Sequence, residues 1–237
     1  MSALFRSELL EIRTIRTFLW LAVANIAVVL VTAIATAASD DTFNTDQNHR
    51  GVAQIAGIAL ILALISGIIV MGGEARHGTI TQTLLVTPLR ERVVLVKVAV
   101  AALIGLALAV IAEGLVLLVT VPASLDVHKA GGALLGILIG APLAGALGVG
   151  LGALVYAQGA AIGTSLAWLL IGESLLVPAI SDSAQKYTPG WTFGALASGV
   201  RDGGDQVLGM AGGGVAAAVW TAVFVAAGLL ALLGRDI

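Results

Sequence analysis

Two glutamates stand alone inside long apolar stretches of the sequence. Glu113 and Glu173 are each surrounded by apolar and small residues. An ionised carboxylate in such surroundings is costly, so it normally faces protein, water or a bound cation. We expect the two acids at similar depth, about seven or eight residues from the end of their stretches, roughly 11 Å along a helix. One hypothesis is that they line a shared cavity that favours cationic or hydrogen-bonding compounds. The alternative is that neighbouring backbone, Ser or Thr groups satisfy each acid.

Other kinds of chemistry find little support. The chain has no cysteine, which excludes disulfides, thiolate metal sites and cysteine nucleophiles. Its three histidines, His49, His77 and His128, all fall in polar segments outside the apolar stretches. No histidine is therefore available as the base of a Ser/His catalytic pair within those stretches. We expect no catalytic residue and no metal site, and no basic patch indicates nucleic-acid binding.

The composition indicates a membrane protein. Of the 237 residues, 59% are hydrophobic and 11% are charged, whereas soluble domains are about a quarter charged. A helix needs about 20 apolar residues to cross the hydrocarbon core. Six stretches meet this length, near residues 18–38, 51–71, 93–121, 131–156, 160–180 and 210–233. We therefore expect a single all-α transmembrane domain over residues 1–237 with six transmembrane helices.

Lysine and arginine indicate the orientation of these spans. Eight lie before the first span, between the second and third, or after the last, and four lie in the alternate segments. This bias predicts that both termini are cytoplasmic. Ala35-Thr36-Ala37 resembles the cleavage site of a signal peptide, but the preceding apolar run exceeds the usual 7–15 or so residues of a signal core. We expect the first span to be retained.

Two regions outside the spans and one within the fourth span have alternatives. In residues 1–17, Phe5, Leu9 and Ile12 recur at helical spacing, which predicts an amphipathic helix in the membrane interface. The alternative is that this segment is a basic anchor that only fixes topology. The segment 181–209 predicts short re-entrant or interfacial helices, or a plain extracellular loop. In the fourth span, Gly132, Gly136 and Gly140 form a small-residue stripe for helix packing, which could also act as a sliding surface.

The segment between the second and third spans carries the most specific pattern. In residues 72–92, Gly78 precedes a possible capping box, Thr79 with Gln82, and Thr87-Pro88 ends the helix that it begins. A short helix here would lie across the cytoplasmic ends of two spans, where a partner protein can push on it. The pattern consists of Glu74, Arg76, His77, Gly78, Thr79, Ile80, Thr83, Leu84, Leu85, Pro88 and Arg90, followed by Arg92 and Lys97.

This pattern resembles the type-2 ABC transporter permeases, the membrane subunits of ATP-binding cassette exporters. The basic N-terminal helix, the six spans and the proline-aromatic segment before the sixth are similar too, so the resemblance covers essentially the whole chain. It implies that residues 72–92 contain the coupling helix, which contacts a separate ATPase subunit. It also implies a second permease subunit, identical or related, and a multi-pass location in the bacterial cytoplasmic membrane.

The resemblance can be checked against the lysines. A phosphate-binding loop needs a Gly-Lys-Ser/Thr sequence, and none of Lys97, Lys129 and Lys186 follows a glycine. We therefore expect no cofactor on this chain, with ATP and magnesium bound by the partner ATPase. Glu113 and Glu173 become candidates for the translocation pathway, in an exporter whose cargo, such as drugs, the sequence leaves open. A proton-coupled secondary transporter that uses these two acids is the alternative function.

Overall fold

The computed structural model confirms an all-α protein with six helices long and apolar enough to cross a membrane. It describes Phe5, Glu8, Leu10 and residues 16–38, 45–77, 90–155, 157–205 and 207–234, and these contain no strand. The six candidate spans are Arg16–Ala37, Asn48–Gly73, Glu91–Thr120, Val127–Val155, Gln158–Ile180 and Met210–Leu233. The chain is therefore a multi-pass membrane protein, and each observed span overlaps one of the predicted stretches.

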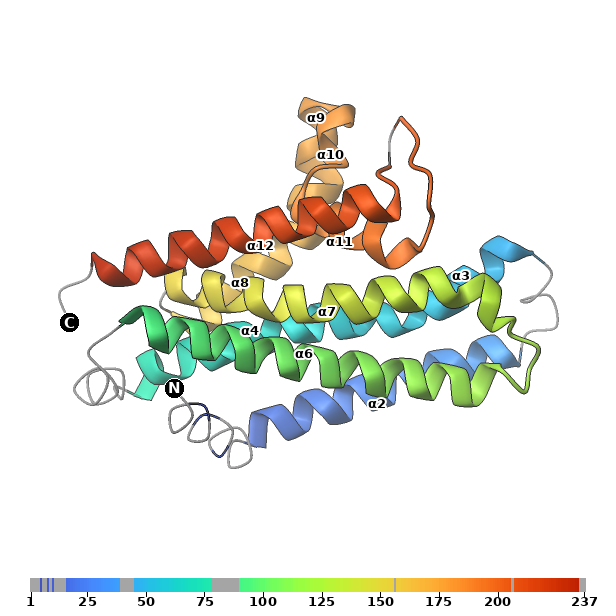
Figure 1. Cartoon of the computed structure of the whole chain (residues 1–237), viewed down its shortest axis with the longest axis horizontal. Coiled ribbons are helices and arrows are strands. Elements are labelled where there is room, and N and C mark those ends of the chain that lie inside the picture. Colours follow the sequence, from blue (N-terminus) through green and yellow to red (C-terminus); the bar gives the residue numbers. More distant parts are fainter. Residues whose placement is uncertain are drawn as a thin grey trace.

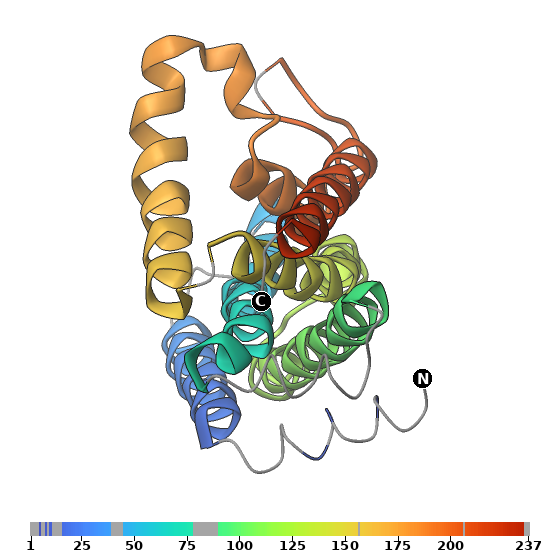
Figure 2. The same cartoon turned by 90° about the vertical axis from the view of Figure 1, so that its left-hand side faces the viewer.

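The fourth span, α7 (Val127–Val155), lies at the centre of the bundle (Figures 1 and 2). It packs against α4 (Ile58–His77), α6 (Arg90–Thr120) and α12 (Met210–Leu233). Its buried residues are mostly glycine and alanine. Because lipid is as apolar as a leucine side chain, membrane helices associate through close packing, and small residues permit the closest approach. This composition explains why α7 is the helix that the others surround.

Two of the spans are not continuous α-helices. The second consists of α3 (Asp46–Ala53), the 3₁₀ turn η1 (Gln54–Gly57) and α4, and the Thr45 side chain accepts the N–H of Asn48 at the start of α3. The fifth consists of α8 (Gln158–Ala167), the π-helical η2 (Trp168–Leu176) and α9 (Val177–Ile180). Wide π-helical turns inside helices are rare and often occur at functional sites.

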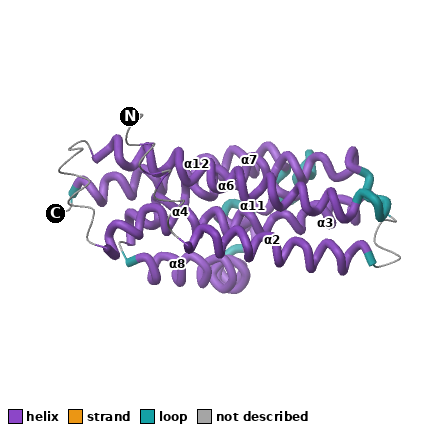
Figure 3. Tube along the Cα trace, turned by 90° about the horizontal axis from the view of Figure 1, so that it is seen from below, coloured by secondary structure: helices purple, strands orange, loops and turns teal. Residues whose placement is uncertain are grey.

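The fifth span leaves the bundle instead of running along it. Figures 1 and 2 show α8 beside the bundle and α9 far from it, and Figure 3 shows part of this span nearly end-on while the other spans lie lengthwise. Its apolar side chains Leu170, Ile171 and Leu175 are exposed. An apolar span with this exposure needs lipid or another protein around it.

The segment before the last span folds back onto the bundle. It contains α10 (Asp182–Gln185) and α11 (Pro189–Ser198), and α11 packs against α7 and α12. Gly199 ends α11 in the left-handed conformation, with φ of 65°. A hydrogen bond from Trp220 Nε1 to the Tyr187 carbonyl, 2.7 Å long, ties this segment to α12. Helical structure is therefore present in the predicted segment 181–209.

Candidate functional site

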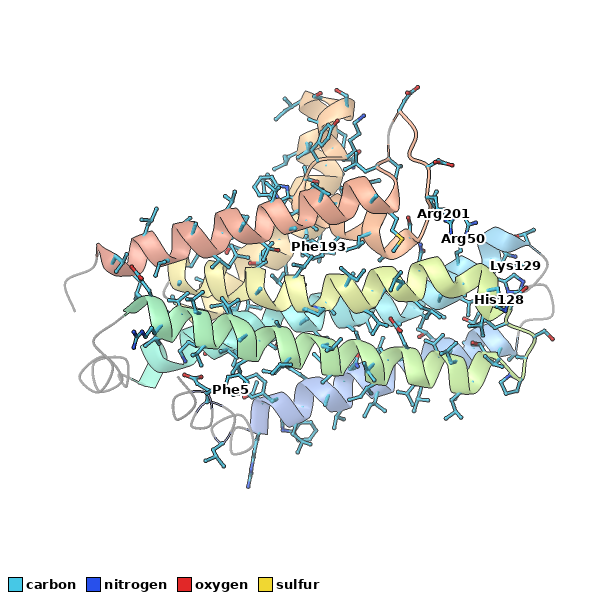
Figure 4. The ribbon with its side chains drawn as sticks, in the orientation of Figure 1. Phe5, Arg50, His128, Lys129, Phe193 and Arg201 are labelled. Carbon is cyan, nitrogen blue, oxygen red and sulfur yellow. The ribbon has the colours of Figure 1, made fainter. Side chains whose placement is uncertain are left out.

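A cavity of about 710 Å³ lies between the fifth span and the rest of the bundle. Its walls come from α4, α7, α8, η2, α11 and α12, so it forms only because the fifth span diverges. Most lining side chains are apolar, and Trp168, Trp191, Phe193 and Phe224 are aromatic. Figure 4 labels Phe193, which lies between α12 and α7 in that view. The volume is within the range of about 300–1,000 Å³ that is usual for pockets that bind small molecules.

Glu173 is the acidic residue in the wall of this cavity. It belongs to η2 and is 2% exposed. Its Oε1 accepts the backbone N–H of Gly190 at 2.9 Å, and its Oε2 accepts that of Trp191 at 3.2 Å. These are amides of the first turn of α11, which have no partner within their own helix. The carboxylate of the fifth span therefore caps the N-terminus of α11.

Two further contacts belong to this junction. Gln185 Nε2 donates to the Glu173 carbonyl at 3.1 Å, so both the side chain and the backbone of Glu173 are bonded to the segment before α12. A Cβ at Gly190 would collide with Glu173 Oε2. Only glycine leaves the carboxylate room to reach the two amides. The sequence reasoning did not identify Gln185 and Gly190 as site residues, although glycine is the usual residue where another group closely approaches the backbone.

Two further polar side chains of the wall are engaged within their own helix. Thr164 and Ser165 in α8 donate hydrogen bonds of 2.7 Å to carbonyls one turn earlier in their own helix. Each oxygen of the Glu173 carboxylate accepts one of these amide hydrogen bonds and can accept another. The cavity can thus hold an apolar molecule against its aromatic walls, with a carboxylate available to a donor on that molecule.

Glu113 lies elsewhere, on α6, and does not line this cavity. It is 6% exposed, and its buried Oε1 has no hydrogen-bond partner among the residues that the structure describes. We had considered that Glu113 and Glu173 line one shared cavity. Of the two, only Glu173 lies in the wall of this cavity. The two acids have similar depth along their spans but belong to helices that diverge from one another.

The glycine stripe of α7 makes close helix contacts. A Cβ at Gly132 would lie 2.6 Å from the carbonyl oxygen of Gly199, and one at Gly136 would collide with the carbonyl oxygen of Leu196. At Gly140 the nearest atom would be Leu60 Cδ2 of α4, at 2.9 Å. Gly132 and Gly136 therefore hold α11 against α7 at distances that exclude even alanine, whereas at Gly140 the Leu60 side chain could move aside.

Most of the predicted coupling residues lie outside the described residues. Glu74, Arg76 and His77 are in the last turns of α4, and Arg90 begins α6. The residues that fall outside are Gly78, Thr79, Ile80, Thr83, Leu84, Leu85 and Pro88. The structure shows that this segment joins neighbouring ends of two packed helices, α4 and α6.

A buried ion pair lies at the same end of the bundle. Lys97 Nζ is 2.8 Å from Glu8 Oε1 and 3.1 Å from Glu8 Oε2, and it donates to the Val70 carbonyl at 3.2 Å. Both side chains are buried, Lys97 to 1% exposure. The pair joins the N-terminal segment to α4 and α6. The sequence held a signal for it, because an acid on an apolar helix face and a lysine inside a span are each costly unless paired.

Comparisons with known proteins leave the chain unassigned. No protein-family model matches it, and no curated protein matches it.

Proposed function

We propose that this chain is the permease subunit of an ATP-binding cassette exporter, coupled to a separate ATPase subunit. The observation that carries the proposal is the residue pattern from Glu74 to Lys97, between two spans of a six-span membrane protein. Its resemblance to the coupling segment of type-2 ABC permeases gives this pattern a function. ATP and magnesium then belong to the partner ATPase.

The buried ion pair supports this role mechanically. The coupling segment follows α4 and precedes α6, and Lys97 binds Glu8 and the Val70 carbonyl at the neighbouring ends of these helices. A force applied to the segment would act on α4, α6 and the N-terminal segment together, because a buried ion pair and a carbonyl hydrogen bond resist separation. Such a rigid junction suits a device that transmits the motion of an ATPase.

The cavity between the fifth span and the rest of the bundle supports a role of this region in translocation. It opens beside the fifth span, whose exposed apolar side chains can be covered by lipid or by another protein. A second permease subunit, identical or related, would provide that covering and complete the pathway, with Glu173 as a polar group in its wall. Both termini are cytoplasmic in this proposal, in the bacterial cytoplasmic membrane.

The test is to express the chain with candidate ABC ATPases and to measure ATP hydrolysis by the purified complex in liposomes. We expect the chain and the ATPase to form a stable complex. The double variant Glu74→Ala/Arg76→Ala should still hydrolyse ATP in this complex but should no longer export. Lys186→Gln, in the segment between α10 and α11, is the matched control and should export normally. Export that persists without any ATPase would overturn the proposal.

Glu113 favours a second candidate, a proton-coupled secondary transporter. Its buried Oε1 has no hydrogen-bond partner in the described part of the chain, and an acid inside a span is a candidate member of a proton pathway. In the absence of an ATPase, liposomes with an imposed proton gradient would then accumulate cargo, and Glu113→Gln would abolish the accumulation. Transport that depends on ATP and ignores the gradient would exclude this candidate.

A further inference from the structure

The π-helical segment of the fifth span, η2, has its backbone hydrogen bonds in an unusual register. At its end, the N–H of Val177 donates to the Gly172 carbonyl, five residues earlier. In an α-helix the same N–H would donate to the Glu173 carbonyl, four residues earlier. Because π-helical turns are rare, contacts outside the helix must favour this register over the α-helical one.

Pro178 leaves each of the two registers with one carbonyl that lacks a donor. Proline has no backbone N–H. In the π register the residue at this position would donate to Glu173, and in the α register it would donate to Ser174. The missing hydrogen bond therefore falls on the Glu173 carbonyl in the π register and on the Ser174 carbonyl in the α register.

Gln185 supplies the donor that the π register lacks. Its Nε2 donates to the Glu173 carbonyl at 3.1 Å, and Glu173 is buried. A buried carbonyl without a donor disfavours its conformation by a factor of about 5–150. The Ser174 carbonyl points about 100° away around the helix, so the same contact gives the α register nothing. Gln185 therefore selects the π register.

The side chain of Glu173 favours the same register. Its carboxylate accepts the amides of Gly190 and Trp191, so the backbone and the side chain of one residue are both bonded to the segment before α12. That segment begins with α10, which packs against α9 at the end of the fifth span (Figure 1). The contacts that hold the register thus come from residues that follow η2 in the chain.

The register determines which side chains face the cavity. Trp168, Leu169 and Glu173 belong to η2 and line the cavity wall. A π-helical ring closes one residue later than an α-helical ring, so a change to the α register rotates the residues that follow by roughly 100°. The Glu173 carboxylate would then turn away from the amides of α11, and other side chains would replace it in the wall.

We propose that the fifth span adopts two hydrogen-bond registers and that Gln185 is the positioning residue that holds it in the π-helical one. Gln185 does not line the cavity, so it acts on a bound compound only through the side chains of η2. A compound that fits one of the two linings shifts the span toward that register. This inference goes beyond the proposed exporter function, and its test needs neither an ATPase nor a cargo.

The experiment measures the distance between two spin labels in the full chain, reconstituted in lipid nanodiscs. The chain has no cysteine, so labels attach only at introduced ones. The reporter pair is Ile180→Cys in α9 and Val215→Cys in α12, both at exposed positions. A helix with its side chains has a radius of about 5 Å, so a rotation of roughly 100° moves the label on α9 by up to about 8 Å.

Two variants should shift the reporter pair in the same way for different reasons. Gln185→Leu removes the donor of the π register, and Pro178→Ala gives the α register the N–H that it lacks. Each should raise the ratio of the α to the π register by a factor of about 5–150, seen as a second distance. Ser183→Ala in α10, whose hydroxyl lies 3.1 Å from that of Ser181, is the control and should match the wild type.

A second labelled pair, Leu118→Cys in α6 and Val215→Cys in α12, reports on the bundle and should keep its distance in every variant. Pro178→Ala adds a backbone donor to a helix, so loss of folding does not account for its effect, and it tests the proposal even if Gln185→Leu does not fold. An unchanged reporter distance in Pro178→Ala would overturn the proposal. An equal shift in Ser183→Ala or in the bundle pair would overturn it as well.

Discussion

Replacing Lys97 with methionine removes the cation of the buried Lys97–Glu8 pair and leaves the Glu8 carboxylate without this counter-charge. In the wild type, Lys97 Nζ is 2.8 Å from Glu8 Oε1, and both side chains are buried. Methionine has nearly the same length and fits the apolar surroundings, so packing changes little. The change therefore isolates the electrostatic contribution.

The magnitude follows from this burial. Removing one partner of a buried ion pair costs about 3–5 kcal/mol, because the remaining charge is desolvated and uncompensated. Lys97→Met and Glu8→Gln should each lower the free energy of unfolding by an amount near this range. The loss in Glu8→Gln should be the smaller one, because Lys97 Nζ still donates to the Val70 carbonyl. The double variant Glu8→Leu/Lys97→Met removes both charges and should return to within about 1–2 kcal/mol of the wild type.

The assay is equilibrium unfolding of the purified protein in mixed micelles, followed by circular dichroism. A loss of 3–5 kcal/mol corresponds to a fall of roughly 10 °C in Tm for a chain of this size. Glu91→Gln, which changes an exposed acid in the first turn of α6, is the control and should stay within about 0.5 kcal/mol. Single variants that each lose less than about 1 kcal/mol, or a double variant whose loss is the sum of both, would refute the reasoning.

Two further predictions concern glycines with matched controls. Gly132→Ala should destabilise the protein by about 1–3 kcal/mol, because its Cβ meets the Gly199 carbonyl oxygen, while Gly131→Ala, whose Cβ has no described atom within 4 Å, should lose no stability in the same unfolding assay. Gly190→Ala should displace the Glu173 carboxylate and cost about 1–3 kcal/mol through the unbonded amides of α11, whereas Gly194→Ala in the same helix, also with no described atom within 4 Å, should cost nothing. If a control variant lost as much stability as the variant it is paired with, the contacts described for Gly132 or Gly190 would be contradicted.

The spans are the part of the fold that the sequence predicts directly. Hydropathy and length are local properties, and lipid imposes one requirement on every span, that its backbone hydrogen bonds be satisfied within the helix. The predicted stretch 210–233 therefore coincides with α12, and the stretch 18–38 is within two residues of α2 (Arg16–Ala37). The divergence of the fifth span has no such local signature, since its composition is that of any apolar helix.

The candidate site depended on contacts between distant residues. From the sequence, Glu113 and Glu173 are alike: single acids at similar depth in apolar helices. The structure separates them, because Glu173 accepts two amides of the first turn of α11, whereas Glu113 keeps a buried oxygen with no partner among the described residues. Whether a buried carboxylate is satisfied depends on which donors the fold brings to it, and those donors lie 17 and 18 residues away in the chain.

The same reasoning applies to Glu8 and Lys97, which are 89 residues apart. Composition and periodicity by themselves determined that this is a membrane protein of six apolar helices, because each helix meets the lipid on its own. The cavity and the ion pair exist only through the tertiary structure. Each depends on how helices pack against one another, and that packing is set by small-residue contacts spread over the whole chain.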